Sequence, residues 1–550
     1  MKKIKIIFIL ALFFTSLNGC KDFLEEKPYS FISPENFFKS DRDAELALTG
    51  VYDVLNAASI QGQGNHHMWG RALHYLTQLG NDELVVNNRA ANADFVPYSN
   101  YTYTPETQMT QFNWISFYAG INRANFIVEK VPGIEMDPTR KQQIIGEARL
   151  LRGLFYFYLG WLYGGVPVVT STETNLSAPR NTIQEVMAQA EEDLEFAYDN
   201  LPARNSRDGR VNKYTAGGFL SKLYVYLASC KENNVGASLN SPLNSFAFVN
   251  STEMYDKAHQ YAEDAYLNSG YRLIRPYRDL FLAATESSAR NEMMMLVQAG
   301  PGGNNEYILS AFLNGPAGNV AQAGGTYGWI RPLRELYNRY NANDPRRAHN
   351  FSGNVTPVNP VVINGLTYFT PAAVLANFAN LNLAKYREAD PQSKTSRGIA
   401  NFAGETDFGI LRFADIILTL AETRFKKGDE PGARELLREV RLRACNDNVT
   451  TLNQVTTAYF NTDFMQELME ERSRELCGEG WRRFDLIRTN TLRSTIQNLI
   501  ELGPPSGSAM NLQNVPEVKL NFEDYKIFYP IPARERELNK NLTQNVGYPQ

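Results

Sequence analysis

The chain has 550 residues, of which 43% are hydrophobic and 12% aromatic, and its formal net charge is −4. An acidic chain without a basic block is a poor match for nucleic acid, so we expect no such partner. This length and apolar content can bury a large core, and no low-complexity linker divides the chain.

Residues 1–19 have the pattern of a secretory signal. Lys2, Lys3 and Lys5 precede an apolar run over 6–14, which as a helix would rise only about 14 Å, far less than the roughly 30 Å of a bilayer core. The residues Leu17-Asn18-Gly19-Cys20 resemble the lipobox of bacterial lipoproteins. We therefore expect cleavage after residue 19, acylation of Cys20 (palmitate) and a membrane anchor, followed by a tether over 20–40. The alternative is an ordinary signal peptide with a cysteine near its cleavage site.

Helical periodicity dominates after the tether, and each stripe predicts an amphipathic helix with one buried face. The stripes are Ala44, Leu48, Val51 and Leu55; Phe219, Leu223, Tyr226 and Cys230; Ala258, Ala262 and Ala265; and Ala433, Leu437, Val440 and Ala444. A segment over 141–163 has few polar faces and predicts a core helix that ends at Gly164-Gly165-Val166-Pro167. Small alanines facing large aromatics are typical of tetratricopeptide packing, although no clean 34-residue period is visible.

Two long stretches lack this periodicity. Residues 84–112 are rich in Asn, Tyr and Thr, and residues 300–329 are too rich in glycine for a helix or a central strand. We predict irregular loops there, and loops of this length in a compact protein are usually functional or disordered.

Few residues suggest catalysis or metal binding. The five histidines are His66, His67, His74, His259 and His349, and none belongs to a zinc-protease motif. No nucleophile elbow, phosphate-binding loop or dinucleotide fingerprint is present, and none of the 59 acidic residues stands out as half of a catalytic pair. We expect Cys230, Cys445 and Cys477 to be buried free thiols.

The densest charged stretch is 467–488, ELMEERSRELCGEGWRRFDLIR. One interpretation is an anion-binding or catalytic cluster. The other, which we favour, is a helix whose arginines (Arg472, Arg474, Arg482 and Arg483) pair structurally with Glu471, Glu475 and Asp485. Glu470 and Arg474 are also correctly spaced for an ion pair.

That stretch resembles the signature near the end of SusD/RagB-family proteins, the surface glycan-binding lipoproteins of Bacteroidetes. Other passages with the same resemblance are CKDFLEEKP (20–28), GEARLLRGLFYFYLGWLYGGVPVV (146–169), NDPRRAHN (343–350), LAKYREAD (383–390), RFADIILTLAE (412–422) and FYPIPARERELNKNLTQNVGY (528–548). They run through the whole chain in order.

The resemblance implies a mainly α fold of four tetratricopeptide-like helix pairs with long irregular loops. We divide it into an N-terminal region over 41–290 and a C-terminal RagB/SusD region over 291–550. It also implies a protein on the cell surface of the outer membrane that binds oligosaccharide for a SusC-like TonB-dependent transporter. Neither catalytic residues nor a cofactor nor a metal belongs to that function.

Sugar rings have apolar faces that aromatic side chains cover, and hydroxyls that Asn, Asp and Arg satisfy. In the family the contacts come from a loop after the first helices and from a mid-chain loop before the Asp-Pro-Arg motif. By position, the expected ligand-binding residues here are Asn87, Asn88, Arg89, Asp94, Phe95, Tyr98, Tyr327 and Trp329. Trp329 could instead pack against a helix that begins near Pro332. Trp69, Trp114, Trp161 and Trp481 are expected in the core.

Two other functions remain open. Some family members serve peptide importers of the RagA/RagB type, so a peptide-binding lid is the alternative. A hydrolase on a helical scaffold is the third hypothesis.

Overall fold

Helices form most of the fold, as the sequence predicts. The computed structural model describes residues 37–56, 68–86, 94–173, 175–204, 209–282, 285–298, 318–320, 324–326, 330–353, 359–363, 366–370, 381–386, 406–500 and 515–550. Cys20 and the leader lie outside these residues. No helix in the described part combines the length and apolarity needed to cross a bilayer.

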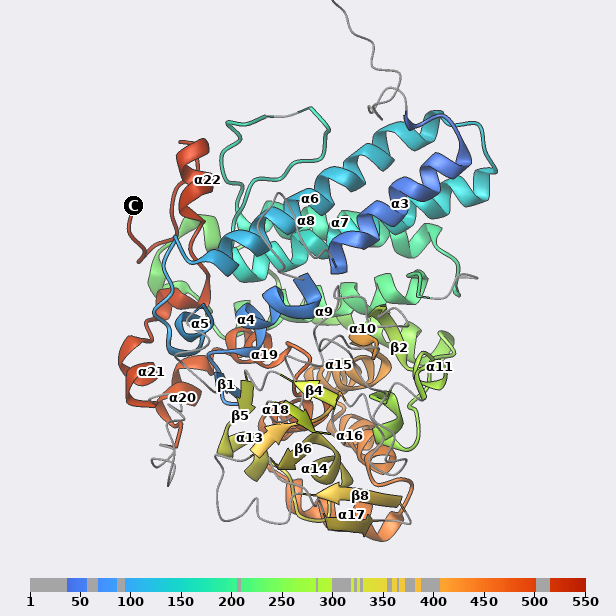
Figure 1. Ribbon diagram of the computed structural model, residues 1–550, viewed down its shortest axis with the longest axis vertical. Helices are drawn as coiled ribbons and strands as arrows, with labels where there is room; N and C mark the ends of the chain where they lie inside the picture. The colour runs from blue at the N-terminus through green and yellow to red at the C-terminus, as the bar shows by residue number, and fades with distance from the viewer. Residues whose placement is uncertain are drawn as a thin grey trace, which may run out of the picture.

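The long helices pack in succession along the chain, each against the next (Figure 1). They are α3 (Asp41–Asn56), α6 (Gln108–Lys130), α7 (Pro138–Tyr163), α8 (Ile183–Asn200), α9 (Lys213–Glu232), α10 (Ser251–Asn268), α15 (Phe413–Lys426) and α16 (Glu430–Ala444). Read as α3–α6, α7–α8, α9–α10 and α15–α16, this series contains the tetratricopeptide-like pairs that the resemblance implies.

Local signals fix where these helices begin and end. The Asp137 side chain accepts a hydrogen bond from the Arg140 amide, and Pro138 occupies the first turn of α7. Gly164 ends that helix at φ 78°, a conformation that disfavours a side chain. The predicted stop at Gly164 is therefore confirmed.

The predicted helical stripes are buried on α3, α9, α10 and α16. Four tryptophans that the sequence places in the core are at most 3% exposed: Trp69, Trp114, Trp161 and Trp481. The three cysteines of the described residues, Cys230, Cys445 and Cys477, are buried and free, as expected.

The strands form short antiparallel ladders of two. The pairs are β1 (Leu84–Val86) with β5 (Ile330–Pro332), β2 (Met293–Val297) with β10 (Phe408–Arg412), β3 (Gly318–Val320) with β4 (Gly324–Thr326), β6 (Phe351–Gly353) with β9 (Leu381–Leu383), and β7 (Asn359–Ile363) with β8 (Leu366–Thr370).

Shorter helices connect and cover these elements. They are α4 (Leu73–Gln78), α5 (Val96–Asn100), α11 (Glu286–Ala289), α13 (Arg334–Asn338), α14 (Pro345–Asn350), α17 (Val449–Tyr459), α18 (Phe464–Leu476), α19 (Arg482–Arg488), α20 (Leu492–Gln497), α21 (Val515–Asn521) and α22 (Ala533–Leu538), with a π-helical turn η2 (Met68–Ala72) and 3-10 turns η3 (Val131–Gly133), η4 (Ala237–Leu239), η5 (Pro242–Asn244), η6 (Tyr277–Leu280) and η10 (Asp524–Ile527).

The prediction of an irregular loop over 84–112 is wrong in part. The stretch begins with strand β1, contains α5 and ends inside α6. Its tyrosines are core residues rather than exposed loop residues, because Tyr98, Tyr101 and Tyr103 are at most 3% exposed.

The C-terminal segments return to the N-terminal helices, and Figure 1 shows α19 beside α4 and α22 beside the start of α6. The Tyr529 hydroxyl donates to the Leu76 carbonyl at 2.8 Å. Arg180 donates to the Thr543 carbonyl at 3.0 Å and to Asn545 Oδ1 at 2.6 Å. These contacts tie the two regions of the chain together.

Candidate functional site

The ladder of β1 and β5 joins two segments far apart in the sequence. Its register pairs Leu84 with Pro332, Val85 with Arg331 and Val86 with Ile330. The ladder continues where the Leu333 amide donates to the Glu83 carbonyl at 2.7 Å. Because the strands are antiparallel, residue 87 follows Val86 at the same ladder end where residue 329 precedes Ile330.

That end is where both predicted ligand segments begin. Asn87, Asn88 and Arg89 continue from β1, and Tyr327 and Trp329 precede β5. These five residues lie outside the described residues, so their roles stay predictions. The strand pairing itself is a described feature, and it gives the two segments one common base.

Three predicted ligand residues are described, and two of them differ from expectation. Asp94 is exposed, as a ligand contact requires. Phe95 and Tyr98 are only 3% and 1% exposed. The Phe95 ring stacks on Tyr75 with centroids 4.0 Å apart, and the Arg71 guanidinium lies 5.1 Å from its centroid. Neither buried ring offers a free face to a sugar, so we assign both residues to the core and remove them from the ligand site.

Tyr98 belongs to a cluster of buried tyrosines. Tyr98 stacks on Tyr103 at 5.7 Å, and Tyr103 approaches Tyr529 at 4.8 Å. The Tyr98 hydroxyl hydrogen-bonds Thr110 Oγ1 at 2.9 Å, and the Tyr103 hydroxyl donates to the Lys526 carbonyl at 3.0 Å. These hydroxyls bond to other parts of the fold, and burial raises the pKa of Tyr101 above its ordinary value, so the cluster belongs to the core.

Two acidic residues anchor β1 to the helices beneath it. Asp82 accepts from Arg482 at 2.6 and 2.8 Å and from Arg339 at 2.5 Å. Glu83 Oε1 accepts from the Ser473 hydroxyl at 2.6 Å. Burial raises the pKa of Glu83 to about 7, although Arg482 and Arg339 act in the opposite direction.

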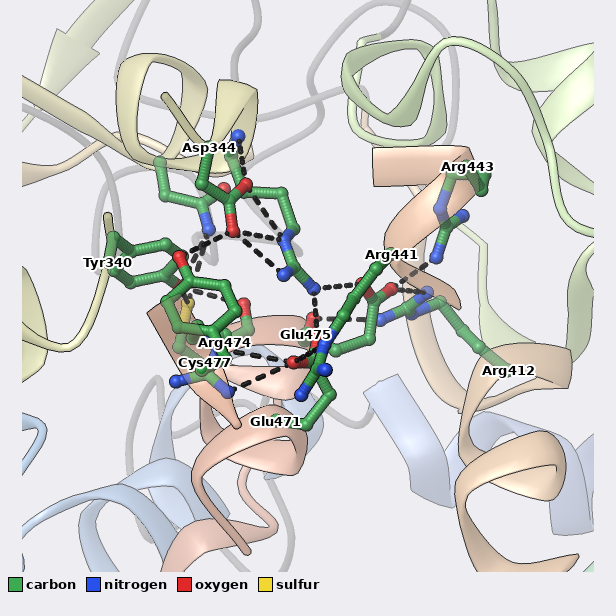
Figure 2. Close-up of polar contacts among 12 residues, drawn as sticks. Tyr340, Asp344, Arg412, Arg441, Arg443, Glu471, Arg474, Glu475 and Cys477 are labelled. Atoms are coloured by element: carbon green, nitrogen blue, oxygen red, sulfur yellow. Dashed lines mark hydrogen bonds and ion pairs between the residues drawn. The ribbon is translucent and has the colours of Figure 1, made fainter. Parts of the chain in front are cut away.

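A second polar cluster lies deeper, where α18 meets α14, α16 and β10 (Figure 2). Arg346 binds Asp344, Glu471 and Glu475 at 2.8, 2.8 and 3.1 Å. Arg412 binds Glu475 at 3.1 Å, and Arg443 binds the same carboxylate. All these side chains are fully buried.

This buried network answers the question posed by the charged stretch 467–488. Burial alone would raise the pKa of the Glu471 carboxyl, but Arg346, Arg441 and Arg474 hold that pKa well below its usual range. A carboxylate that stays ionised, with several cations on it and no exposure, is poorly suited to proton transfer. The structural interpretation is confirmed.

Several of the partners differ from those predicted. Arg472 does pair with Asp485, at 2.8 Å, and Arg474 pairs with Glu471, at 2.9 Å. Glu470 pairs with Arg339 and Arg482 instead of Arg474. Arg483 hydrogen-bonds the Tyr101 hydroxyl and the Lys526 carbonyl rather than a carboxylate.

Within the described residues no group of histidine, cysteine or acidic side chains is arranged to hold a metal. His74 is buried between Trp69 and Gln78, and burial lowers its pKa to about 3, so its ring is neutral. His349 Nε2 donates to the Lys385 carbonyl at 2.9 Å. His66 and His67 lie outside the described residues.

Two open pockets lie elsewhere. One, of about 430 Å³, is lined by the connection between α9 and α10, including Lys231, Asn234 and Phe246. The other, of about 480 Å³, lies along α18, α19 and α20 and includes Gln466, Met469 and Thr495. None of the predicted ligand residues lines either pocket.

The fold is a tetratricopeptide-like helical scaffold in which the β1–β5 ladder joins two distant parts of the chain. Two family models match the chain: one described as "SusD family" over residues 287–548, and one described as "Starch-binding associating with outer membrane" over residues 22–225. The chain belongs to the SusD/RagB family.

Individual relatives agree over nearly the full length. The chain is 26% identical to the SusD-like protein P38 of Formosa agariphila, covering 100% of this chain and 99% of that protein. A SusD homolog of Bacteroides thetaiotaomicron has a similar structure, with a TM-score of 0.72, 22% identity, and 94% and 98% of the two chains covered. Surface glycan-binding protein A of the same species, solved in complex with laminarihexaose, gives a TM-score of 0.68 at 18% identity, covering 92% and 100%.

Proposed function

We propose that this chain is a cell-surface glycan-binding lipoprotein that captures oligosaccharide and delivers it to a SusC-like TonB-dependent transporter in the outer membrane. The observation that carries the proposal is the β1–β5 ladder, which gives the two predicted ligand segments a common base. A structurally similar protein binds laminarihexaose, and the family description couples starch binding with the outer membrane.

The ligand residues in this proposal are Asn87, Asn88, Arg89, Asp94, Tyr327 and Trp329, with Cys20 as the lipid attachment. Covering roughly 100 Å² of one sugar face contributes about 2.5 kcal/mol at about 25 cal/mol/Å². Two aromatic platforms contribute about 5 kcal/mol before association costs. The affinity expected is on the order of tens of micromolar to millimolar, which suits a protein that must release its cargo.

Affinity electrophoresis in gels that contain single polysaccharides tests the site. The wild type should be retarded by at least one glycan, and Trp329→Ala should lose most of that retardation because a ring face is removed. Phe460→Ala is the matched control, since Phe460 is an aromatic residue that is 58% exposed directly after α17. Equal retardation of wild type and Trp329→Ala would refute Trp329 as a platform.

Fractionation tests the anchor. Cys20→Ala should move the protein from the membrane fraction to the soluble fraction, because the acylation site is gone. A Cys20→Ala protein that stays with the membrane would contradict the lipoprotein assignment.

Two further measurements separate the rival functions. Calorimetry with oligopeptides should give no heat of binding, and a peptide that binds in place of sugars would support the importer-lid alternative. Incubation with glycans should release no new reducing ends, and their appearance would identify a hydrolase.

A further inference from the structure

One buried arginine has no partner for its charge. The Arg331 side chain on β5 is 3% exposed, and its Nε and Nη1 atoms make no hydrogen bond. The other buried arginines of the described residues all bind carboxylates, carbonyls or hydroxyls, as Arg412 and Arg443 do with Glu475 in Figure 2. Arg331 is the exception.

The strand residues that pair beside Arg331 are apolar. The other five residues of the ladder are Leu84, Val85, Val86, Ile330 and Pro332, and β5 also packs against the buried strand β9. Burial lowers the pKa of Arg331 to about 10, so the guanidinium is still charged at neutral pH.

A buried charge without a partner is expensive to maintain, and proteins usually pair such a group or remove it. Methionine or leucine would fill the same volume in this ladder at less cost. Unpaired buried charges are typical of binding sites, where the ligand supplies the missing partner.

The position of Arg331 fits such a role. It pairs with Val85, one residue from the ladder end at which both predicted ligand segments begin. A residue at this position of the ladder is held by a paired strand rather than by a loop.

We infer that Arg331 binds an anionic group on the glycan, the carboxylate of a uronic acid or a sulfate ester, and so selects acidic oligosaccharides. This inference rests on the proposed function and names its ligand class. A planar guanidinium donates two parallel hydrogen bonds to a carboxylate or sulfate and gains the opposite charge it lacks. A neutral hydroxyl accepts one hydrogen bond and leaves the charge uncompensated.

Calorimetric titration of the purified chain tests the inference. The probes are oligogalacturonides, alginate oligosaccharides and carrageenan oligosaccharides as acidic ligands, with laminarihexaose as the neutral ligand. The wild type should bind at least one acidic probe ten or more times as tightly as laminarihexaose. That preference should shrink as salt rises.

Variants identify the residue responsible. Arg331→Gln should lose the acidic preference by tenfold or more, and Arg331→Lys should keep part of it, because lysine retains the charge without the bidentate geometry. Arg123→Gln removes a partly exposed arginine on α6 that pairs with Asp53, and as the control it should leave the preference unchanged. The Tm of ligand-free Arg331→Gln should equal or exceed that of the wild type, since an unpaired buried charge is removed.

The outcomes are distinct. If neutral glycans bind as tightly as acidic ones, or if Arg331→Gln keeps the preference, the inference fails and glycan binding stands. A clearly lower Tm for both Arg331 variants would show an internal partner and also overturn it. If no glycan binds, the proposed function itself fails, and a peptide whose carboxylate needs Arg331 would overturn the assignment to sugars.

Discussion

At the scale of single residues, Glu83 links the candidate site to pH. Its pKa is raised to about 7 from an ordinary 4.5, with burial as the main cause. A carboxyl whose pKa is higher in the folded state binds more protons when folded, so its contribution to stability falls as pH rises from about 4.5 to about 7. Above that range the folded chain holds a buried carboxylate at a cost of up to about 3 kcal/mol.

We therefore predict that Glu83→Gln stabilises the protein at pH 8.5 and has little effect at pH 4.5. Thermal unfolding followed at both pH values measures the difference in Tm. Glu253→Gln, at an exposed position on α10, should show no such dependence. A Tm gain for Glu83→Gln that is the same at both pH values would rule out titration of this carboxyl as the cause.

The sequence predicts the structural role of the charged residues better than it predicts their ion-pair partners. The pattern over 467–488 indicates structural ion pairs, because helical spacing brings neighbouring charges together. It does not reveal that Glu475 binds Arg346, Arg412 and Arg443, since each of these comes from a different element. Arg331 gives no signal in the sequence at all, because isolation from other charges is a property of the folded chain.

At the scale of elements, the contact between α6 and α7 depends on Gly120. A Cβ atom added there would overlap the Phe155 ring, which is fully buried. Gly50 on α3 is the matched case, because nothing lies within 4 Å of the Cβ position there.

Gly120→Ala should lower the free energy of unfolding by about 1–2 kcal/mol, because overpacking outweighs the better helix propensity of alanine. Gly50→Ala should raise it by about 0.5–1 kcal/mol. Denaturant unfolding of the two variants beside the wild type gives both values. Stabilisation by Gly120→Ala equal to that by Gly50→Ala would mean that α6 and α7 are not closely packed at this point.

Long helices are predictable from this sequence and short strands are not. The stripe of Ala44, Leu48, Val51 and Leu55 repeats over several turns, so periodicity identifies α3 clearly. Strand β1 has three residues and its partner lies more than 240 positions away, so neither alternation nor a turn signal marks it. The sequence does not reveal that Phe95 and Tyr98 are buried, because their burial depends on contacts with Tyr75 and Tyr529.

At the scale of the whole molecule, many contacts cross the expected boundary between residues 290 and 291. Arg482 on α19 binds Asp82 near β1, α10 packs against α15, and Tyr529 bonds the carbonyl of Leu76. A fragment that ends at 290 would leave Asp82 without its cations and expose the buried faces of α9 and α10.

We predict that the chain unfolds as one unit and that a fragment of residues 37–290 does not fold alone. Calorimetry should show a single transition for the full chain. Near-ultraviolet circular dichroism of the fragment should lack fixed aromatic signals. Two separate transitions, or a fragment with native signals, would instead show two independent domains.

The central claim is that one ligand site is built where β1 and β5 pair. Hydrogen–deuterium exchange of the full chain, with and without an oligosaccharide that it binds, tests this claim most directly. We predict that amides in residues 84–89 and in residues 326–333 gain protection together. Protection limited to one of these segments, or confined to residues 230–247 around the pocket between α9 and α10, would contradict the account.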